Sequence, residues 1–279
     1  MSDHPQKITH VRDLLVPAGI LLLVSGGGIL LDQRLQTGWL SQTMIILAGL
    51  LILAGGIIIR TMPGILAGSL LASISAGGFF LLGALEQTWG VRVGGFLFLF
   101  GTGWWVVFVI CALRLRQQPF WMLLPGSLLV ALGACFLFTP LHLLDLILFL
   151  GVGLAVPLLV WGISRRLMGL IIPGSLLLGA AIGIYLGWGG FQEGTVLAHT
   201  GITLVFFGLG WFLITIISRV VTSQAIWWPL IPGGTFTMVG WGLYIGGNPS
   251  NAVSFISNTG SITLIMLGIY LLLLRKGIH

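Results

Sequence analysis

Two histidines and two acidic residues are the side chains of this sequence best suited to chemistry. His142 and Asp145 stand three residues apart in "LHLLD", and Glu193 and His199 follow in "FQEGTVLAH". Two imidazoles and two carboxylates can bind a transition metal or act as an acid/base pair. The two segments are far apart along the chain, whereas metal motifs rely on tight spacing within one loop or helix turn. Solvated side chains at a membrane surface are therefore the simpler interpretation of these four residues.

The composition of the chain excludes an ordinary soluble domain. Of its 279 residues, 57% are hydrophobic and 6% are charged, and the mean hydropathy is +1.12. Soluble domains carry about 25% charged residues. Apolar runs of about 20 residues, the length with which an α-helix crosses a bilayer, follow one another almost without interruption. The predicted fold is an all-α integral membrane bundle of about ten transmembrane helices, forming a single domain over residues 1–279. The predicted spans are 13–31, 41–59, 64–84, 93–113, 121–138, 143–163, 170–188, 196–217, 229–246 and 255–274.

Lysine and arginine are distributed unevenly between the two sides of this arrangement. With the N-terminus in the cytoplasm, only Arg34 and Arg92 fall in outer loops. This asymmetry follows the positive-inside rule. It predicts a multi-pass protein of the bacterial cytoplasmic (inner) membrane, with both termini in the cytoplasm beside anionic lipid. A nucleic-acid partner is not expected, because the sequence has no concentrated basic face. The inner basic residues are Lys7, Arg12, Arg60, Arg114, Arg116, Arg165, Arg166, Arg219, Arg275 and Lys276.

The string "PGSLL" occurs twice, at residues 125–129 and 173–177, and points to internal repetition. A proline opens each odd-numbered span, where the amide that proline lacks would be unsatisfied in any case. These prolines are Pro17, Pro63, Pro125, Pro173 and Pro232. The predicted repeat is a two-helix hairpin used five times, over residues 13–60, 61–116, 117–166, 167–222 and 223–279. Two helices per unit leave all copies parallel across the bilayer, whereas many secondary transporters use inverted repeats.

Small residues spaced four apart predict where helices pack closely in lipid. One such ladder comprises Gly64, Gly68, Ala72 and Ala76, and a second comprises Gly179, Gly183 and Gly187. The alternative is that the 43 glycines line a pore or a flat ligand such as a quinone or pigment. Tryptophans near both predicted interfaces are typical of anchoring belts. The outer belt holds Trp39, Trp89, Trp188 and Trp241, and the inner belt holds Trp121, Trp161, Trp227 and Trp228.

Ionisable side chains are absent near the midpoint of every predicted span. Ion-coupled carriers and intramembrane hydrolases need such groups inside the membrane. Cys111 and Cys135 are predicted to lie too far apart across the bilayer to form a disulfide. These observations favour a non-catalytic accessory or scaffold subunit that acts through helix packing, with other membrane subunits as partners and without a cofactor. A permease or channel for a neutral or lipidic solute is the alternative, and a membrane enzyme with an outer-face histidine and acid site is the third hypothesis.

The segment "WWPLIPGGTFTMVGWGLY", residues 227–244, resembles the W-x-L-I-P-G-G helix openings of bacterial multi-hairpin membrane proteins of uncharacterised role. Some of these are similar to the transmembrane part of LiaF-like envelope-stress proteins. The resemblance implies a multi-hairpin membrane fold and brings no catalytic residues with it. The soluble domain that accompanies the membrane part of LiaF-like proteins is missing from this sequence.

The uneven distribution of basic residues makes the topology testable. Reporter fusions after Arg116, Arg166 and Lys276 should report the cytoplasm, whereas fusions near Gln36 and Gln192 should report the far side. A C-terminal fusion that reports the periplasm would contradict the topology.

Overall fold

The structure is a computed structural model of the chain. It describes residues 19, 23, 26–28, 30–35, 39–83, 87–116, 118–138, 142–190, 194–222, 226–247, 264–266, 268 and 269. The chain divides into two compact units, residues 1–142 and 143–279. In the described ranges the secondary structure is helical throughout, without strands.

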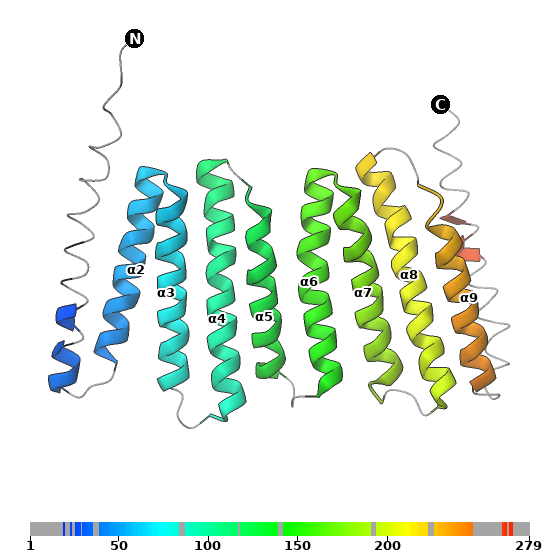
Figure 1. The fold of residues 1–279 in the computed structure, drawn as a ribbon, viewed down its shortest axis with the longest axis horizontal. Helices are drawn as coiled ribbons and strands as arrows, with labels where there is room; N and C mark the ends of the chain where they lie inside the picture. Colours follow the sequence, from blue (N-terminus) through cyan, green and yellow to red (C-terminus); the bar gives the residue numbers. More distant parts are fainter. Residues whose placement is uncertain are drawn as a thin grey trace, which may run out of the picture. The chain divides into compact units, whose positions relative to one another are not determined.

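Each unit contains four long helices joined by short connections (Figure 1). The first unit has α2 (Leu40–Ile59), α3 (Met62–Gly83), α4 (Trp89–Ile110) and α5 (Leu123–Phe138). A π-helical turn, η1 (Cys111–Leu115), extends α4, and a 3-10 turn, η2 (Phe120–Met122), leads into α5. The second unit has α6 (Leu143–Arg165), α7 (Met168–Trp188), α8 (Val196–Thr222) and α9 (Leu230–Gly247).

The predicted membrane helices correspond closely to these elements. Eight predicted spans, from 41–59 to 229–246, coincide with α2 to α9 to within a few residues. Among the described residues, seven helices are long and apolar enough to cross a membrane, and α9 is not one of them. The all-helical class with membrane-length apolar helices is thereby confirmed. The predicted spans 13–31 and 255–274 lie largely outside the described residues.

The helices of each unit form a single layer, in which substantial contacts run only between helices that are neighbours in the chain. In the first unit α2 packs on α3, α3 on α4 and α4 on α5, and in the second α6 packs on α7, α7 on α8 and α8 on α9. Within a unit, the described helices therefore do not surround one another as they would in a closed bundle. Because no other described helix of the same unit covers the broad faces, only 17% to 39% of each membrane-length segment is buried.

Left-handed arginines follow the C-terminal ends of three helices. In each unit, we call the end of the layer at which these arginines lie the basic end. Arg60 follows α2 with φ 59°, Arg116 follows η1 with φ 54°, and Arg166 follows α6 with φ 55°. The chain then turns back at once, because the next amides bond to carbonyls of the helix just ended. The Thr61 amide donates to the Gly56 carbonyl at 2.9 Å, and the Leu167 amide donates to the Gly162 carbonyl at 2.8 Å. This is the geometry in which helices commonly end.

Side chains satisfy helix ends on the side opposite the basic end. A carboxylate oxygen of the buried Asp32 accepts a hydrogen bond of 3.1 Å from the Ser41 amide, at the start of α2. Arg92 donates through Nε to the Leu81 carbonyl at 2.6 Å, near the end of α3, and its guanidinium lies 5.2 Å from the Trp89 ring centroid. An acid at a helix start and a cation at a helix end both suit the helix dipole.

Glycines bring the backbones of α2 and α3 into contact. A Cβ atom built on Gly49 would lie 2.6 Å from the Ala72 amide nitrogen, and one on Gly56 would lie 2.5 Å from the Ile65 nitrogen. A Cβ on Gly68 would overlap the Leu53 backbone. Of the first predicted ladder, Gly64, Gly68 and Ala72 thus face α2, and Ala76 is half-buried.

The second predicted ladder lies on the side of α7 that faces α8. A Cβ on Gly179 would lie 2.6 Å from the Phe206 carbonyl, one on Gly183 would lie 2.8 Å from the Thr203 carbonyl, and one on Gly187 would lie 2.6 Å from the His199 carbonyl. The hydroxyl of Thr203 bridges the same two helices by donating to the Gly183 carbonyl at 3.2 Å. In the first unit the Ser69 hydroxyl joins α3 to α4 by donating to the Gly103 carbonyl at 2.8 Å. Close approach and short polar side chains therefore act together between helices.

Replacing Gly68 with Leu should force α2 and α3 apart. Overpacking of this kind costs about 1–3 kcal/mol, and more where the obstacle is backbone. Thermal unfolding in detergent should show a clear loss of stability relative to the wild type. Gly78 of the same helix is the matched control, because a Cβ there meets nothing within 4 Å. Gly78→Leu should be neutral or slightly stabilising, and equal losses at both positions would show that Gly68 is not at a tight interface.

Candidate functional site

The four residues predicted for metal or acid/base chemistry have different surroundings. His142 is exposed and directly precedes α6, whereas Asp145 is buried in the first turn of α6. His199 is half-buried in the first turn of α8. Glu193 lies outside the described residues. Within the described part of the chain, no three His, Cys, Asp or Glu side chains gather in a way that would hold a metal ion. The four-residue metal site remains a prediction, since one of its ligands is not described.

His199 contributes an aromatic ring to the junction between α7 and α8. Its ring centroid lies 5.5 Å from that of Trp188, with the two planes tilted by 33°. The Nδ1 atom is buried and has no hydrogen-bond partner among the described residues. The backbone carbonyl of His199 accepts a hydrogen bond of 3.1 Å from the Thr203 hydroxyl, where it also faces Gly187. The ring of His199 therefore takes part in the packing between α7 and α8.

Cys111 and Cys135 are both buried, and neither forms a disulfide. Cys111 belongs to the hydrophobic cluster with Ile65, Val107 and Met122. The two thiols therefore serve as small apolar side chains in the first unit.

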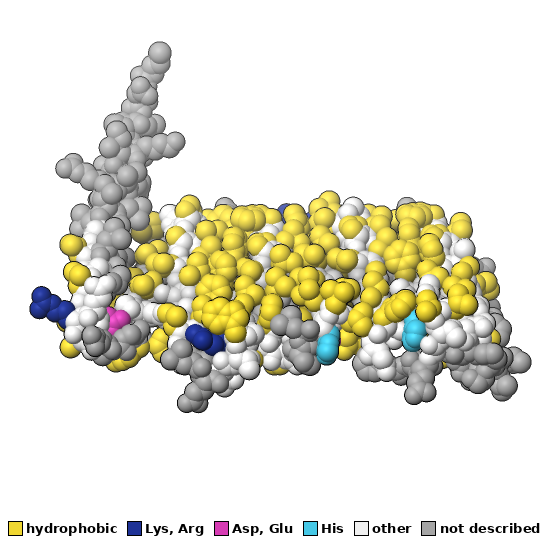
Figure 2. Space-filling model, turned by 60° about the horizontal axis from the view of Figure 1, so that its bottom comes forward, with side chains coloured by type: hydrophobic (Ala, Val, Ile, Leu, Met, Phe, Trp, Pro, Cys, Tyr) yellow, Lys and Arg dark blue, Asp and Glu magenta, His cyan; other side chains and the backbone are white. Residues whose placement is uncertain are grey.

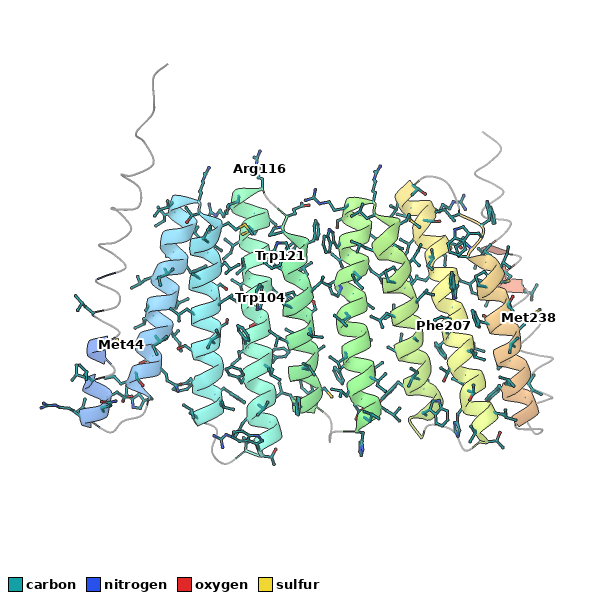
Figure 3. The ribbon with its side chains drawn as sticks, viewed as in Figure 1. Met44, Trp104, Arg116, Trp121, Phe207 and Met238 are labelled. Atoms are coloured by element: carbon teal, nitrogen blue, oxygen red, sulfur yellow. The ribbon has the colours of Figure 1, made fainter. Side chains whose placement is uncertain are left out.

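Edge-to-face tryptophan pairs occur in both units and were not expected from the sequence. In the first unit the Trp104 and Trp121 rings are 6.1 Å apart at 71°, and in the second the Trp211 and Trp228 rings are 5.5 Å apart at 73°. Each pair joins a long helix to the start of the next one, as the labels of Trp104 and Trp121 in Figure 3 show for α4 and α5. Trp121 and Trp228 are 48% and 50% exposed, whereas the indole nitrogens of Trp104 and Trp211 are buried without a partner.

These pairs occupy matching positions in two stretches of sequence. When residues 89–138 are laid on residues 196–245, Trp104 falls on Trp211 and Trp121 falls on Trp228. The matching residues make matching contacts. A Cβ on Gly126 would lie 2.8 Å from the Trp104 Cβ, and one on Gly233 would lie 3.1 Å from the Trp211 Cβ. Other identical pairs are Gly94 and Gly201, Gly101 and Gly208, Gly103 and Gly210, Pro125 and Pro232, and Gly133 and Gly240.

The preceding helices of the two units match in the same way. Laying residues 40–82 on residues 146–188 places Gly68 on Gly174, and these glycines pack against Leu53 and Leu159, which also match. A Cβ on Gly77 would lie 3.0 Å from the Phe96 carbonyl, and the corresponding distance from Gly183 to the Thr203 carbonyl is 2.8 Å. Further identical pairs are Gly56 and Gly162, Arg60 and Arg166, Ile65 and Ile171, and Ser69 and Ser175.

The surface seen in Figure 2 is largely hydrophobic. Its charged and histidine side chains are few and stand toward the margin of the yellow surface. The outer-belt residues Trp39 and Trp89 are exposed, as are the inner-belt residues Trp227 and Trp228. A surface of this kind suits contact with lipid or with other membrane helices rather than with water.

Comparisons with known proteins identify no relative: no protein-family model, no characterised protein and no solved structure matches the chain. The similarity of residues 227–244 to LiaF-like membrane segments therefore stays a prediction.

Substitution of His199 can distinguish a packing role from a role as a metal ligand. If the ring only packs on Trp188, His199→Ala should lower the free energy of unfolding by about 0.5–1.5 kcal/mol, the usual contribution of an aromatic pair. His142→Ala is the matched control and should have no effect, because that side chain is exposed. Elemental analysis of the purified wild type should find no stoichiometric metal. One equivalent of zinc in the wild type that disappears in His199→Ala would instead establish the metal site.

Proposed function

We propose that this protein is a non-catalytic accessory or scaffold subunit of the bacterial cytoplasmic membrane, which binds other membrane proteins through its helix surfaces. The observation that carries the proposal is the single-layer packing within each unit. Each described helix uses its glycine-rich edges to contact its chain neighbours. Among the described helices, no other helix of the same unit makes substantial contact with the broad faces. Val109 of α4 and Ile216 of α8, two helices with a neighbour on each side, are 49% and 51% exposed. Flat apolar surfaces suit helix-to-helix association better than they suit a reaction.

We also infer that the two units are copies of one four-helix module, which itself consists of two hairpins. The matching residues and matching interhelical contacts support this inference. In this register Gly174 of the second "PGSLL" pairs with Gly68 of the string "AGSLL", at residues 67–71, rather than with the glycine after Pro63. An even number of helices per module gives both copies the same orientation across the bilayer. This module pairs α2 with α3 and α4 with α5. The five predicted hairpins, over residues 13–60, 61–116, 117–166, 167–222 and 223–279, instead pair α3 with α4, α5 with α6 and α7 with α8.

A permease or channel for a neutral or lipidic solute is the weaker candidate. A transport path needs helices around a lumen or a cavity at the membrane midplane. Within each unit the helices stand in one layer, so the described helices of a unit do not enclose such a path. Ion coupling would also need ionisable side chains in the bilayer centre. The described carboxylates, Asp32 and Asp145, instead lie beside the starts of α2 and α6.

Photo-crosslinking in native membranes tests the scaffold function directly. A photoreactive amino acid is placed at Val109 of α4 or Ile216 of α8, both of which are exposed on helices with a neighbour on each side. A protein that binds partners through its helix faces should give a discrete higher-mass protein adduct from at least one of these positions.

Buried positions provide the matched control. Ile65 and Ile214 have no exposed surface, and the same amino acid there should not reach a partner. If exposed positions across α2 to α9 give adducts only with lipid, the protein has no partner on its helix faces and the scaffold proposal is wrong.

A further inference from the structure

Arginine occupies a backbone conformation that ordinarily selects glycine, and does so repeatedly at one end of the helices. Arg60, Arg116 and Arg166 are the only described residues other than glycine with positive φ. The described glycine with positive φ is Gly190, which follows α7 at the opposite end. The chain contains 43 glycines, and one of them, Gly190, forms the described left-handed turn at the opposite end. At the basic end it uses arginine instead.

This choice costs stability, because the Cβ of an L-residue crowds the backbone in the left-handed conformation and glycine avoids that crowding. Closure of the helix does not require arginine. The hydrogen bonds that end α2 and α6 are made by backbone groups of Gly56, Thr61, Gly162 and Leu167, and glycine would make them equally well. What arginine provides at these positions, and glycine would not, is therefore its side chain.

Among the described residues, these three side chains have no partner for their positive charge. Arg60, Arg116 and Arg166 are exposed, and no hydrogen bond or ion pair joins their guanidinium groups to the described residues. The described carboxylates cannot neutralise them within the same helix: Asp32 caps the start of α2 and Asp145 lies in the first turn of α6, whereas Arg60 and Arg166 follow the ends of those helices. Figure 3 shows Arg116 extending beyond the end of α4, away from the helices.

We propose that Arg60, Arg116 and Arg166 each hold the phosphate of an anionic phospholipid in the leaflet at the basic end of the helices. An apolar helix of membrane length places the residue that follows it at headgroup depth. A guanidinium binds phosphate through two parallel hydrogen bonds, and an anionic leaflet attracts each basic residue near its surface. Bound lipid thereby supplies the counter-charge that the described residues lack. This inference is independent of the scaffold function and of which side of the membrane the basic end faces.

Half-exposed tryptophan accompanies one of these arginines. Trp121 stands at the start of the helix that follows Arg116, is 48% exposed and lies edge-to-face on the half-buried Trp104. Indole rings prefer the depth at which headgroups meet acyl chains. The connection from η1 to η2 therefore offers a guanidinium for the phosphate and an aromatic surface for the upper part of an acyl chain.

Lipid retention and thermal unfolding test the proposal on the purified full-length protein in a neutral detergent. Native mass spectrometry after addition of phosphatidylglycerol should show retained lipid. Each of Arg60→Gly, Arg116→Gly and Arg166→Gly should reduce the retained number by one. Without lipid, each glycine variant should unfold at a higher temperature than the wild type, because the left-handed residue is relieved. Phosphatidylglycerol should raise the Tm of the wild type and leave that of the triple glycine variant nearly unchanged.

Matched variants separate charge from backbone conformation and from general electrostatics. Arg→Gln at the same three positions should lose the lipid without the gain in Tm. Arg34→Gln removes an exposed arginine from the helical residues 30–35, outside any left-handed turn, and should leave lipid retention unchanged. Phosphatidylcholine and inorganic phosphate should each raise the wild-type Tm less than phosphatidylglycerol does. The proposal is overturned if the glycine variants retain all of the lipid, if Arg34→Gln loses as much, or if inorganic phosphate stabilises equally.

Discussion

Backbone-to-backbone contact at glycine is the interaction on which the rest of this structure depends. In lipid, burying an apolar side chain between helices gains little, because the acyl chains are as apolar as leucine. What remains is dispersion between closely spaced atoms and a few hydrogen bonds from short hydroxyl side chains. The glycines of α3, α4, α7 and α8 permit this close approach, and the hydroxyls of Ser69 and Thr203 reinforce it. A helix with glycine along two opposite edges packs against two neighbouring helices. The bulky residues on its broad faces do not bring a further helix into contact.

The sequence was sufficient to locate most of the helices, because the thickness of a bilayer fixes their length and because proline marks where several of them begin. The ladder of Gly179, Gly183 and Gly187 could likewise be recognised from its spacing. The sequence could not show which partner each ladder meets, since Gly187 packs on the His199 carbonyl and any small or polar residue would have suited the pattern equally well. The single layer was missed for a related reason. A helix face that contacts lipid and a helix face that is buried in a bundle have the same apolar residue pattern, so the sequence does not distinguish them.

The candidate site was less predictable than the fold. His142 and His199 drew attention because imidazole and carboxylate groups can do chemistry, yet His199 packs as an aromatic ring against Trp188. The tryptophan pairs carried a signal in the sequence, but a comparison anchored on the prolines did not reveal it. The signal emerges only when the sequence of four helices is aligned with that of the next four. Trp104 then aligns with Trp211, and Gly68 aligns with Gly174. The left-handed arginines carried none, because arginine rarely adopts positive φ and its presence does not mark the residue at which a helix ends.

The restriction of substantial contacts to chain neighbours bears on how the protein is made. Within each unit, every described helix makes its substantial contacts with the helices next to it in the chain. No described helix has to remain unpaired in the membrane until a distant part of the chain emerges from the ribosome. Contacts that are local in sequence form quickly and leave few opportunities for mispairing. Each unit can therefore assemble in order during insertion, one helix at a time, and a chain interrupted after any complete hairpin would already hold that hairpin's final packing.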